Sequence, residues 1–406
     1  MKDQFVVPAR LKTTSLVLIG IGLLTLLIGI IVFLVGSHGE HGSTRFWAGL
    51  LQNSSFFLLV VLASTFFIGA TTLAHGGWQV AFRRVPEAIS MAVPVLGIIF
   101  FGILMALIYG KAGHIYHWLD KEHVAHDPIL SWKAAFLNPT FFTVAAVITI
   151  GLWIFFTIKL RNMSIEEDGW GLSKDSGKRI LWRNTVMCGG FVVIYALSVG
   201  STTPWLWLMS IDAHWYSTMY SWYTFVSSWV SGISLIALWV IYLKRQGYLP
   251  YVTEEHLHDL GKLAFGFSIF WTYLWFSQYM LIWYANMPEE IIYFKPRLWG
   301  EWRPIFFLNL IINFITPLLF LMSKDNKRNW SSMTFITVLI IGGHWMDFWQ
   351  MVGPGTYQHL VFPWFELGIG VGFVGLIIWL VSRQLTKAPL VPKSHPYLKE
   401  SIIHQA

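Results

Sequence analysis

The chain has 406 residues, of which 55% are hydrophobic and only 12% are charged. This composition excludes a water-soluble globular fold and predicts an all-α polytopic membrane protein, because lipid-facing helices need long apolar runs. The net charge of +7 follows the membrane topology and does not indicate nucleic-acid binding. Because Cys188 is the single cysteine, the chain cannot form an intrachain disulfide, and we expect it to hold no iron–sulfur cluster or c-type haem.

Ten apolar runs are long enough to cross the hydrocarbon core, which takes about 20 helical residues. The first run is too long for a cleavable signal and lacks its small-residue pattern, so we interpret it as a membrane helix. The predicted spans lie near residues 14–36, 53–74, 88–110, 140–160, 184–203, 221–243, 261–286, 304–322, 330–352 and 362–383.

Ten spans place both termini on the same side of the membrane. That side carries 21 of the 28 Lys and Arg residues, and the other side carries 7. The positive-inside rule therefore predicts that both termini are cytoplasmic.

The second span ends at His75, and Arg83, Arg84 and Glu87 follow it. An imidazole at the inner membrane edge is either a proton-uptake residue or a satisfied structural side chain, and both interpretations stay open. We expect the two arginines and Glu87 to form an ion-pair cluster on the surface. Depth and charge also make His75 with Glu87 a candidate for an inner proton step.

Two predicted outer loops are rich in histidine, one with His38 and His41, the other with His114 and His117. The spacing of these histidines matches no firm metal-ligand signature, so we predict no metal site. The second loop is expected to form an amphipathic segment at the membrane interface.

The most informative stretch is 204–223, between the fifth and sixth spans. It holds Asp212 and His214 among four Trp and three Tyr residues, and it carries no Lys or Arg. An acid and an imidazole two residues apart at the membrane edge could exchange protons with a flat apolar ligand. Trp and Tyr also gather at headgroup level in any membrane protein, so a plain aromatic belt remains the alternative.

Polar residues in the seventh and eighth spans are expected to face other helices, because an unpaired polar group is costly in hydrocarbon. Gln278 is one such residue, and Asn309 and Asn313 are two more. The pair Thr316–Pro317 predicts a kink in the eighth span.

The ninth span contains His344 and Asp347, which lie three residues apart on one helix face. Asp347 is the most costly residue to place in the membrane, which makes it a functional candidate. Both residues are predicted in the outer half of the membrane, with Glu366 near the outer start of the tenth span. Because His75 and His344 lie at opposite depths, we do not expect a haem with two histidine ligands.

An aromatic outer pocket with carboxylate and imidazole groups suits a quinol, whose hydroxyl protons must leave when its electrons do. Three segments, 207–218, 259–262 and 277–290, resemble the membrane subunits of the NrfD/polysulfide-reductase type. More closely, they resemble the two quinone-site subunits of bacterial alternative complex III, a quinol:cytochrome c (or electron-carrier) oxidoreductase. The resemblance covers spans 2 to 9.

The resemblance implies two four-helix bundles flanked by the first and last helices. The corresponding regions are 1–52 (flanking helix and outer loop), 53–203 (first bundle), 204–220 (aromatic connector), 221–352 (second bundle) and 353–406 (flanking helix and tail).

The resemblance also implies a bacterial inner-membrane complex in which quinone or menaquinol is the substrate or a bound lipid. The implied partners are an iron–sulfur protein, c-type haem proteins, a paralogous ten-helix subunit and lipids, with a terminal oxidase as a further candidate. It makes Asp212 and His214 the catalytic or proton-exit candidates, and His117 matches a His-Trp pair in the corresponding outer loop. The remaining candidates are Trp207, Ser217, Gln278 and Trp283 for the pocket, and His75, Glu87, His344, Asp347 and Glu366 for proton steps.

The family has two paralogous subunits. One oxidises quinol beside the iron–sulfur clusters, and the other lies away from them and is suspected to conduct protons or to support the assembly. The short N-terminus and compact length favour the second, so the chain alone is not expected to be catalytic. A secondary transporter is the third hypothesis, although the chain lacks a convincing pair of Gly/Pro breaks in corresponding helices.

Overall fold

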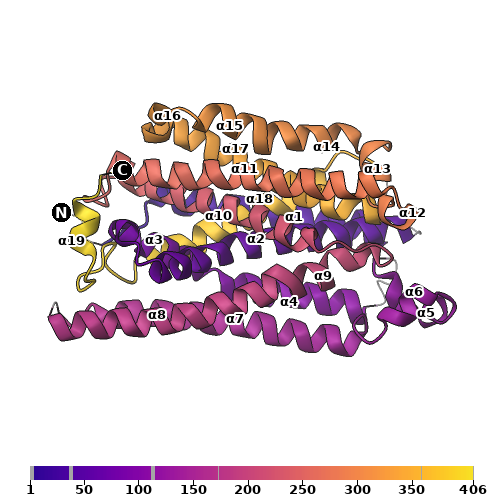
Figure 1. The fold of residues 1–406 in the computed structure, drawn as a ribbon, viewed down its shortest axis with the longest axis horizontal. Coiled ribbons are helices and arrows are strands. Elements are labelled where there is room, and N and C mark those ends of the chain that lie inside the picture. The colour runs from indigo at the N-terminus through magenta and orange to yellow at the C-terminus, as the bar shows by residue number, and fades with distance from the viewer. Residues whose placement is uncertain (1–3, 36–39, 111–114, 172, 358, 406) are drawn as a thin grey trace.

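The structure is a computed structural model that describes residues 4–35, 40–110, 115–171, 173–357 and 359–405. In this part of the chain all regular elements are helices and no strand occurs. The long helices run side by side along one axis (Figure 1). Nine helices of the described residues are long and apolar enough to cross a membrane, which indicates a multi-pass membrane protein.

Each of these nine helices overlaps one predicted span. They are Ala9–Val35, Gly42–Leu73, Arg84–Tyr109, Pro139–Glu167, Lys174–Trp207, Met219–Arg245, Arg303–Leu321, Trp330–Thr356 and Trp364–Leu385. The remaining predicted span, 261–286, lies in α11 (Glu254–Ala285), which is not among the nine. Its many Trp, Tyr and polar residues lower its hydropathy, although its 32 residues exceed the length that a span needs.

Two groups of helices pack along their lengths. In the first group α2 (Glu40–Leu73) contacts α4 (Val93–Tyr109) and α8 (Lys174–Leu197), and α7 (Pro139–Glu167) lies between the latter two. The second group consists of α10 (Met219–Arg245), α11, α14 (Arg303–Leu310), α15 (Thr316–Leu321) and α17 (Trp330–Thr356). The groups meet where α2 contacts α10 and α17.

A third pair of helices flanks these groups. The first helix, α1 (Ala9–Gly29), packs on α18 (Trp364–Leu385), which also contacts α2 and α3 (Arg84–Ser90). Glycines permit this close approach, since a Cβ atom added to Gly372 would lie only 2.8 Å from the Cα atom of Gly22. The outer face of α1 is apolar and exposed, with Leu23 and Leu24 at 57% and 58%, as expected for a surface that contacts lipid.

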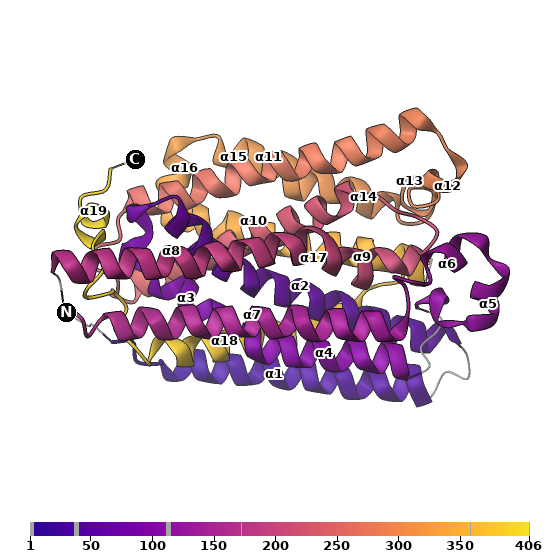
Figure 2. The ribbon, with the colours of Figure 1, turned by 60° about the horizontal axis from the view of Figure 1, so that its bottom comes forward.

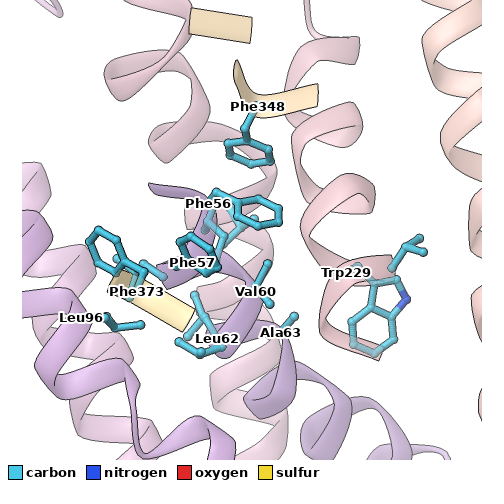
Figure 3. Packing of buried hydrophobic residues seen from close by; sticks show 14 of the residues in the cluster. Phe56, Phe57, Val60, Leu62, Ala63, Leu96, Trp229, Phe348 and Phe373 are labelled. Carbon is cyan, nitrogen blue, oxygen red and sulfur yellow. The ribbon is translucent and has the colours of Figure 1, made fainter. Parts of the chain in front are cut away.

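Buried hydrophobic side chains, several of them aromatic, pack around α2 (Figure 3). Phe56 of α2 lies edge-on to Phe348 of α17 with ring centres 5.2 Å apart, and Phe57 stacks on Phe373 of α18 at 5.5 Å. Trp229 of α10 lies edge-on to Phe66 of α2. Because α2 contributes to each contact, it is the central helix that positions α10, α17 and α18 relative to one another.

Connecting elements lie at both ends of the bundle (Figures 1 and 2). One end, here the terminal end, holds both chain termini together with α3, α16 (Lys324–Arg328) and α19 (Leu398–Ile402). The opposite, distal end holds α5 (Lys121–His126), α6 (Pro128–Lys133), α12 (Pro288–Ile291) and α13 (Lys295–Leu298).

Several short elements interrupt or connect the long helices. A π-helical turn, η6 (Ile311–Ile315), separates α14 from α15 just before Pro317, at the position of the predicted kink. The other short elements are the π-helical turns η1 (Ile30–Val35) and η4 (Ser198–Thr202), the 3₁₀ turns η2 (Gly77–Phe82), η3 (His117–Leu119) and η5 (Met209–Asp212), and α9 (Thr203–Trp207).

Candidate functional site

Asp347 lies inside the second helix group, and its carboxylate accepts hydrogen bonds from four side chains. Its Oδ1 atom accepts from the Tyr223 hydroxyl and from Asn309 Nδ2, the latter at 3.0 Å. Its Oδ2 atom accepts from Ser227 Oγ and Trp271 Nε1, both at 3.0 Å. The donors come from α10, α11 and α14, so three helices surround a side chain with no solvent exposure.

His344 joins this cluster through Ser227. The Ser227 hydroxyl oxygen lies 3.0 Å from Nδ1 of His344, and Nδ1 is 3.9 Å from Asp347 Oδ2. Because the Ser227 hydroxyl has one proton and donates it to Asp347, Nδ1 of His344 must carry the proton that it shares with Ser227. Nε2 of His344 is then the free acceptor nitrogen, and within the described residues this buried atom has no hydrogen-bond partner.

A small cavity lies beside Asp347 on the side of the distal end. Its free volume is about 20 Å³, and its lining includes Gln278, Tyr293, Arg297 and Gln350. A polar cavity needs about 10–15 Å³ to hold one water molecule. The cavity therefore has room for a single water between Asp347 and Arg297, and no room for a quinone ring.

Arg297 is a buried cation that the sequence analysis did not single out. Its guanidinium donates to three main-chain carbonyl oxygens, of Tyr293 (2.5 Å), Met351 (3.0 Å) and Gln350 (3.3 Å), and lies 3.5 Å from the centre of the Tyr293 ring. Burial raises the pKa of Tyr293 to about 12, so its hydroxyl stays neutral beside this charge. The sequence signal was weak, because a single Arg directly after a proline between two predicted spans is typical of an exposed loop.

Asp212 ends the 3₁₀ turn η5 and packs against the backbone of α17. A Cβ atom added to Gly355 would lie 2.9 Å from both Asp212 carboxylate oxygens, so the carboxylate lies directly against this glycine. Burial raises the pKa of the Asp212 carboxyl, while the charges of Arg297 and His117 lower it in part. Asp212 is thus electrostatically coupled to Arg297 on the cavity side and to His117, whose side chain is exposed.

The structure does not bring Asp212 and His214 together. His214 instead pairs through Nε2 with Oδ2 of Asp127, 87 residues earlier in the chain. Asp127 caps α6 with its other oxygen, which accepts from the main-chain N–H groups of Ile129 and Leu130. The hydrogen bond from His214 is the largest cause that lowers the pKa of Asp127. The His214 pair therefore fastens α6 to the connector, separately from Asp212.

The predicted pocket residues lie in different places. Gln278 lines the small cavity, with its side chain almost fully buried. Trp207 packs in the first helix group against Phe100, at 4.8 Å between ring centres. Trp283 is 59% exposed and lies on the outer surface of α11, and Ser217 lies in the connector with its main-chain N–H 3.4 Å from a Met sulfur.

Glu87 forms a buried cluster with three arginines, which corrects the expectation of a surface cluster. Arg83, Arg84 and Arg161 donate to its carboxylate at 3.1, 3.0 and 2.7 Å. Arg161 and Ser164 of α7 both donate to Glu87, so α7 packs against the cluster. His75 lies at the same end and lines a cavity of about 10 Å³ with Arg83, the arginine that also pairs with Glu87.

Glu366 has a comparable structural contact at the other end of the molecule. Its carboxylate accepts two hydrogen bonds from Arg45, both at 3.0 Å, and is fully buried. The pair fastens the start of α18 to α2. No proton donor or acceptor of the Asp347 cluster contacts it among the described residues.

No metal centre is present among the described residues, since no group of three or more His, Cys, Asp and Glu side chains is placed to hold an ion. His38 and His114 lie outside the described residues, as does the side chain of His41. The single cysteine, Cys188, is buried in α8.

Comparisons with known proteins add no relative. A scan against protein-family models and a search of curated proteins found no match to this chain. The function is therefore argued from the Asp347 cluster and its surroundings.

Proposed function

We propose that this chain is a proton-conducting membrane subunit of a respiratory quinol:electron-carrier oxidoreductase of the alternative complex III type. The observation that carries the proposal is the hydrogen-bonded chain from His344 through Ser227 to Asp347, which ends beside a water-sized cavity. An ionisable residue at this depth is a functional hypothesis by default, because its burial is costly. The resemblance of the three segments quoted above supplies the class of complex.

The His344 chain can transfer a proton to Asp347 by exchange of hydrogens along existing bonds. A proton arriving at Nε2 of His344 allows the Nδ1 proton to pass to Ser227 Oγ, whose own proton passes to Asp347 Oδ2. His344 then holds the other neutral tautomer, Ser227 has again one proton, and Asp347 is protonated. No bond between heavy atoms changes and no electron moves.

Buried hydroxyls on α10 lead to this chain from the terminal end. Ser227, Ser231 and Ser234 recur at intervals of four and three residues, so they lie on one helix face, and none of them is exposed. Ser231 Oγ donates to the Ser227 carbonyl oxygen, and Ser234 Oγ has no partner within the described residues. Small hydroxyl residues also permit close helix packing, which would by itself account for these serines. The stripe is therefore additional support for the proposal and not its main observation.

On the distal side, the proton leaves Asp347 through the water-sized cavity. Arg297 lines that cavity and is coupled to Asp212, which in turn is coupled to the exposed His117. The raised pKa of Asp212 allows it to hold a proton nearer to neutral pH than an exposed aspartate does. We propose Asp212 and His117 as the exit side of the route.

A quinol is proposed as the substrate of the complex, with electrons passing to iron–sulfur and c-type haem partners. The cavity beside Asp347 does not fit the ring of a quinone, because its free volume is about 20 Å³. This favours the proton-conducting paralogue over the quinol-oxidising one, and we assign no redox step to this chain.

The finer topology belongs to the same proposal. We propose that α11 is the tenth span, that the two helix groups are the two four-helix bundles of the family, and that the terminal end faces the bacterial cytoplasm. The excess of Lys and Arg at that end supports this orientation.

The test is the purified complex in proteoliposomes, with Asp347→Asn in this chain and Asp325→Asn, on the exposed start of α16, as the control. We expect proton translocation beyond the protons that quinol oxidation itself releases to fall at least about tenfold in the first variant, with unchanged quinol oxidation and subunit content. Loss of quinol oxidation in an intact complex would assign the quinol site to this chain instead. Unchanged proton release would make Asp347 a structural residue and overturn the proposal.

A further inference from the structure

An apolar groove of about 460 Å³ lies between α1, α2, α10, α17 and α18 in the half of the bundle near the terminal end. This volume is within the range of about 300–1,000 Å³ that small-molecule sites occupy. Aliphatic side chains line most of its length, among them Val60, Leu235, Leu238, Val338 and Ile377. The groove is separate from the Asp347 cluster, since the two sites share no lining residue.

The mouth of the groove has the side chains of a membrane interface. Trp239, Tyr242 and Arg245 recur every three residues on α10, and all three line the groove. Trp and Tyr gather at headgroup level, so Arg245 lies where headgroups lie and Leu235 lies deeper in the hydrocarbon. The groove thus runs from the headgroup region into the membrane, in the direction of an acyl chain.

The rim of the mouth is positively charged. The Arg245 guanidinium donates to the Ser331 hydroxyl at 3.0 Å, and no carboxylate pairs with it among the ion pairs of the described residues. Arg10 and Lys12 flank Leu11, another lining residue, and both are exposed. A basic rim above an apolar groove complements a molecule with an anionic head and an apolar tail.

We infer that this groove binds one anionic glycerophospholipid, with an acyl chain along the groove and the phosphate at Arg245. Lipid tails are as apolar as the lining, so burial in the groove alone selects no particular lipid. Selection comes from the headgroup, because each basic residue near the membrane surface attracts anionic lipid by a factor of about five. An uncharged quinone would gain no attraction between opposite charges from Arg245.

The test uses the full-length chain, purified in mild detergent and mixed with equal amounts of phosphatidylglycerol and phosphatidylethanolamine. Native mass spectrometry then counts the lipids that each chain retains. We expect one retained lipid per chain, with phosphatidylglycerol preferred about fivefold. Arg245→Gln should lower this preference several-fold, whereas Arg179→Gln, a matched change on the exposed part of α8 at the same end, should leave it unchanged.

A second variant tests the groove itself. Val338→Trp fills the groove and should abolish retention, while Val193→Trp, on the exposed face of α8, should not. Resistance of Cys188 to thiol reagents checks that each variant is folded, because this single cysteine is fully buried. Retention that persists in Val338→Trp, a preference that persists in Arg245→Gln, or a retained quinone in place of phospholipid would each overturn the inference.

Discussion

The Arg161 guanidinium donates to the Glu87 carboxylate at 2.7 Å and thereby joins α7 to α3 at a site where both side chains are almost fully buried. Arg83 and Arg84 donate to the same carboxylate. Arg84 also pairs with Asp168 at 2.6 Å. Glu87 is consequently the shared anion for three cations, and its charge holds them inside the protein.

Glu87→Gln should therefore destabilise the protein strongly. The substitution keeps the shape of the side chain but removes the charge, and loss of one partner of a buried ion pair costs about 3–5 kcal/mol. The effect is measured as a shift of the unfolding temperature, which is monitored by the labelling of Cys188 as this buried thiol becomes exposed. Glu166→Gln is the control, since Glu166 pairs with Arg183 at the surface, and it should change the unfolding temperature little. Equal shifts of the unfolding temperature in the two variants would show that the buried Glu87 cluster contributes no more to stability than the surface pair.

Ser227→Ala should interrupt the proton chain between His344 and Asp347. The change removes one of the four donors to Asp347 and the only bridge to His344 in the described cluster. We expect the protons conducted in addition to those that quinol oxidation releases to fall by at least about tenfold. The neighbouring Ser228 donates only to the Phe225 carbonyl of its own helix, so Ser228→Ala should conduct normally. Proton release in proteoliposomes compares the two, and equal rates would exclude Ser227 from the route.

His395 should make stability depend on pH in the acid range. Burial, and next the charge of Arg83, lower the pKa of His395 to about 3, whereas an unfolded histidine titrates near 6.5. Between these two pKa values the unfolded chain binds one proton that the folded chain does not bind. The contribution of His395 to the free energy of unfolding is therefore fully present above pH 6.5. It is lost as the pH falls toward 3, by up to about 1.4 kcal/mol per pH unit.

His395→Gln should flatten this part of the profile. His359→Gln should not, because the His359 side chain is 80% exposed at the distal end. Unfolding temperatures measured from pH 7 to pH 4 compare the two variants with the unmodified chain. Parallel profiles for all three proteins would show that His395 does not govern the acid response.

Gly372→Leu should separate α1 from α18. A side chain at this position collides with the backbone of Gly22, and overpacking of this kind costs about 1–3 kcal/mol. The matched control is Gly20→Leu, because Gly20 is on α1 with no atom within 4 Å of an added Cβ. Protease sensitivity of the N-terminal segment and the unfolding temperature report the effect. A stable Gly372→Leu protein would contradict the packing of this pair.

Much of the fold could be predicted from the sequence, because apolar runs of sufficient length suffice to place the helices. The least apolar run, in α11, shows the limit of that criterion. Its surface is aromatic, and Trp271 and Gln278 both face inward toward the Asp347 cluster and its cavity. Hydropathy counts Trp and Tyr as polar, although their rings pack in hydrocarbon as aliphatic side chains do.

The site was only partly predictable. The cost of burying a carboxylate singled out Asp347 as a functional candidate, but its hydrogen-bond partners come from helices far away in the sequence. Proximity in sequence was misleading for Asp212 and His214, because the chain turns after η5 and directs them to Gly355 and Asp127 respectively. No local pattern distinguishes a buried Arg297 from an exposed one.

The π-helical turn η6 places one additional residue within the helix that carries Asn309. An α-helix advances about 100° per residue, since 3.6 residues make one turn. Deletion of a single residue from 311–315 would therefore rotate α14 by that angle relative to α15 and take Asn309 away from Asp347. An ordinary helical wheel drawn through this segment misassigns the faces on one side of the turn. A homologue with one residue fewer in this turn must therefore use a different face of the helix that corresponds to α14 to donate to its counterpart of Asp347.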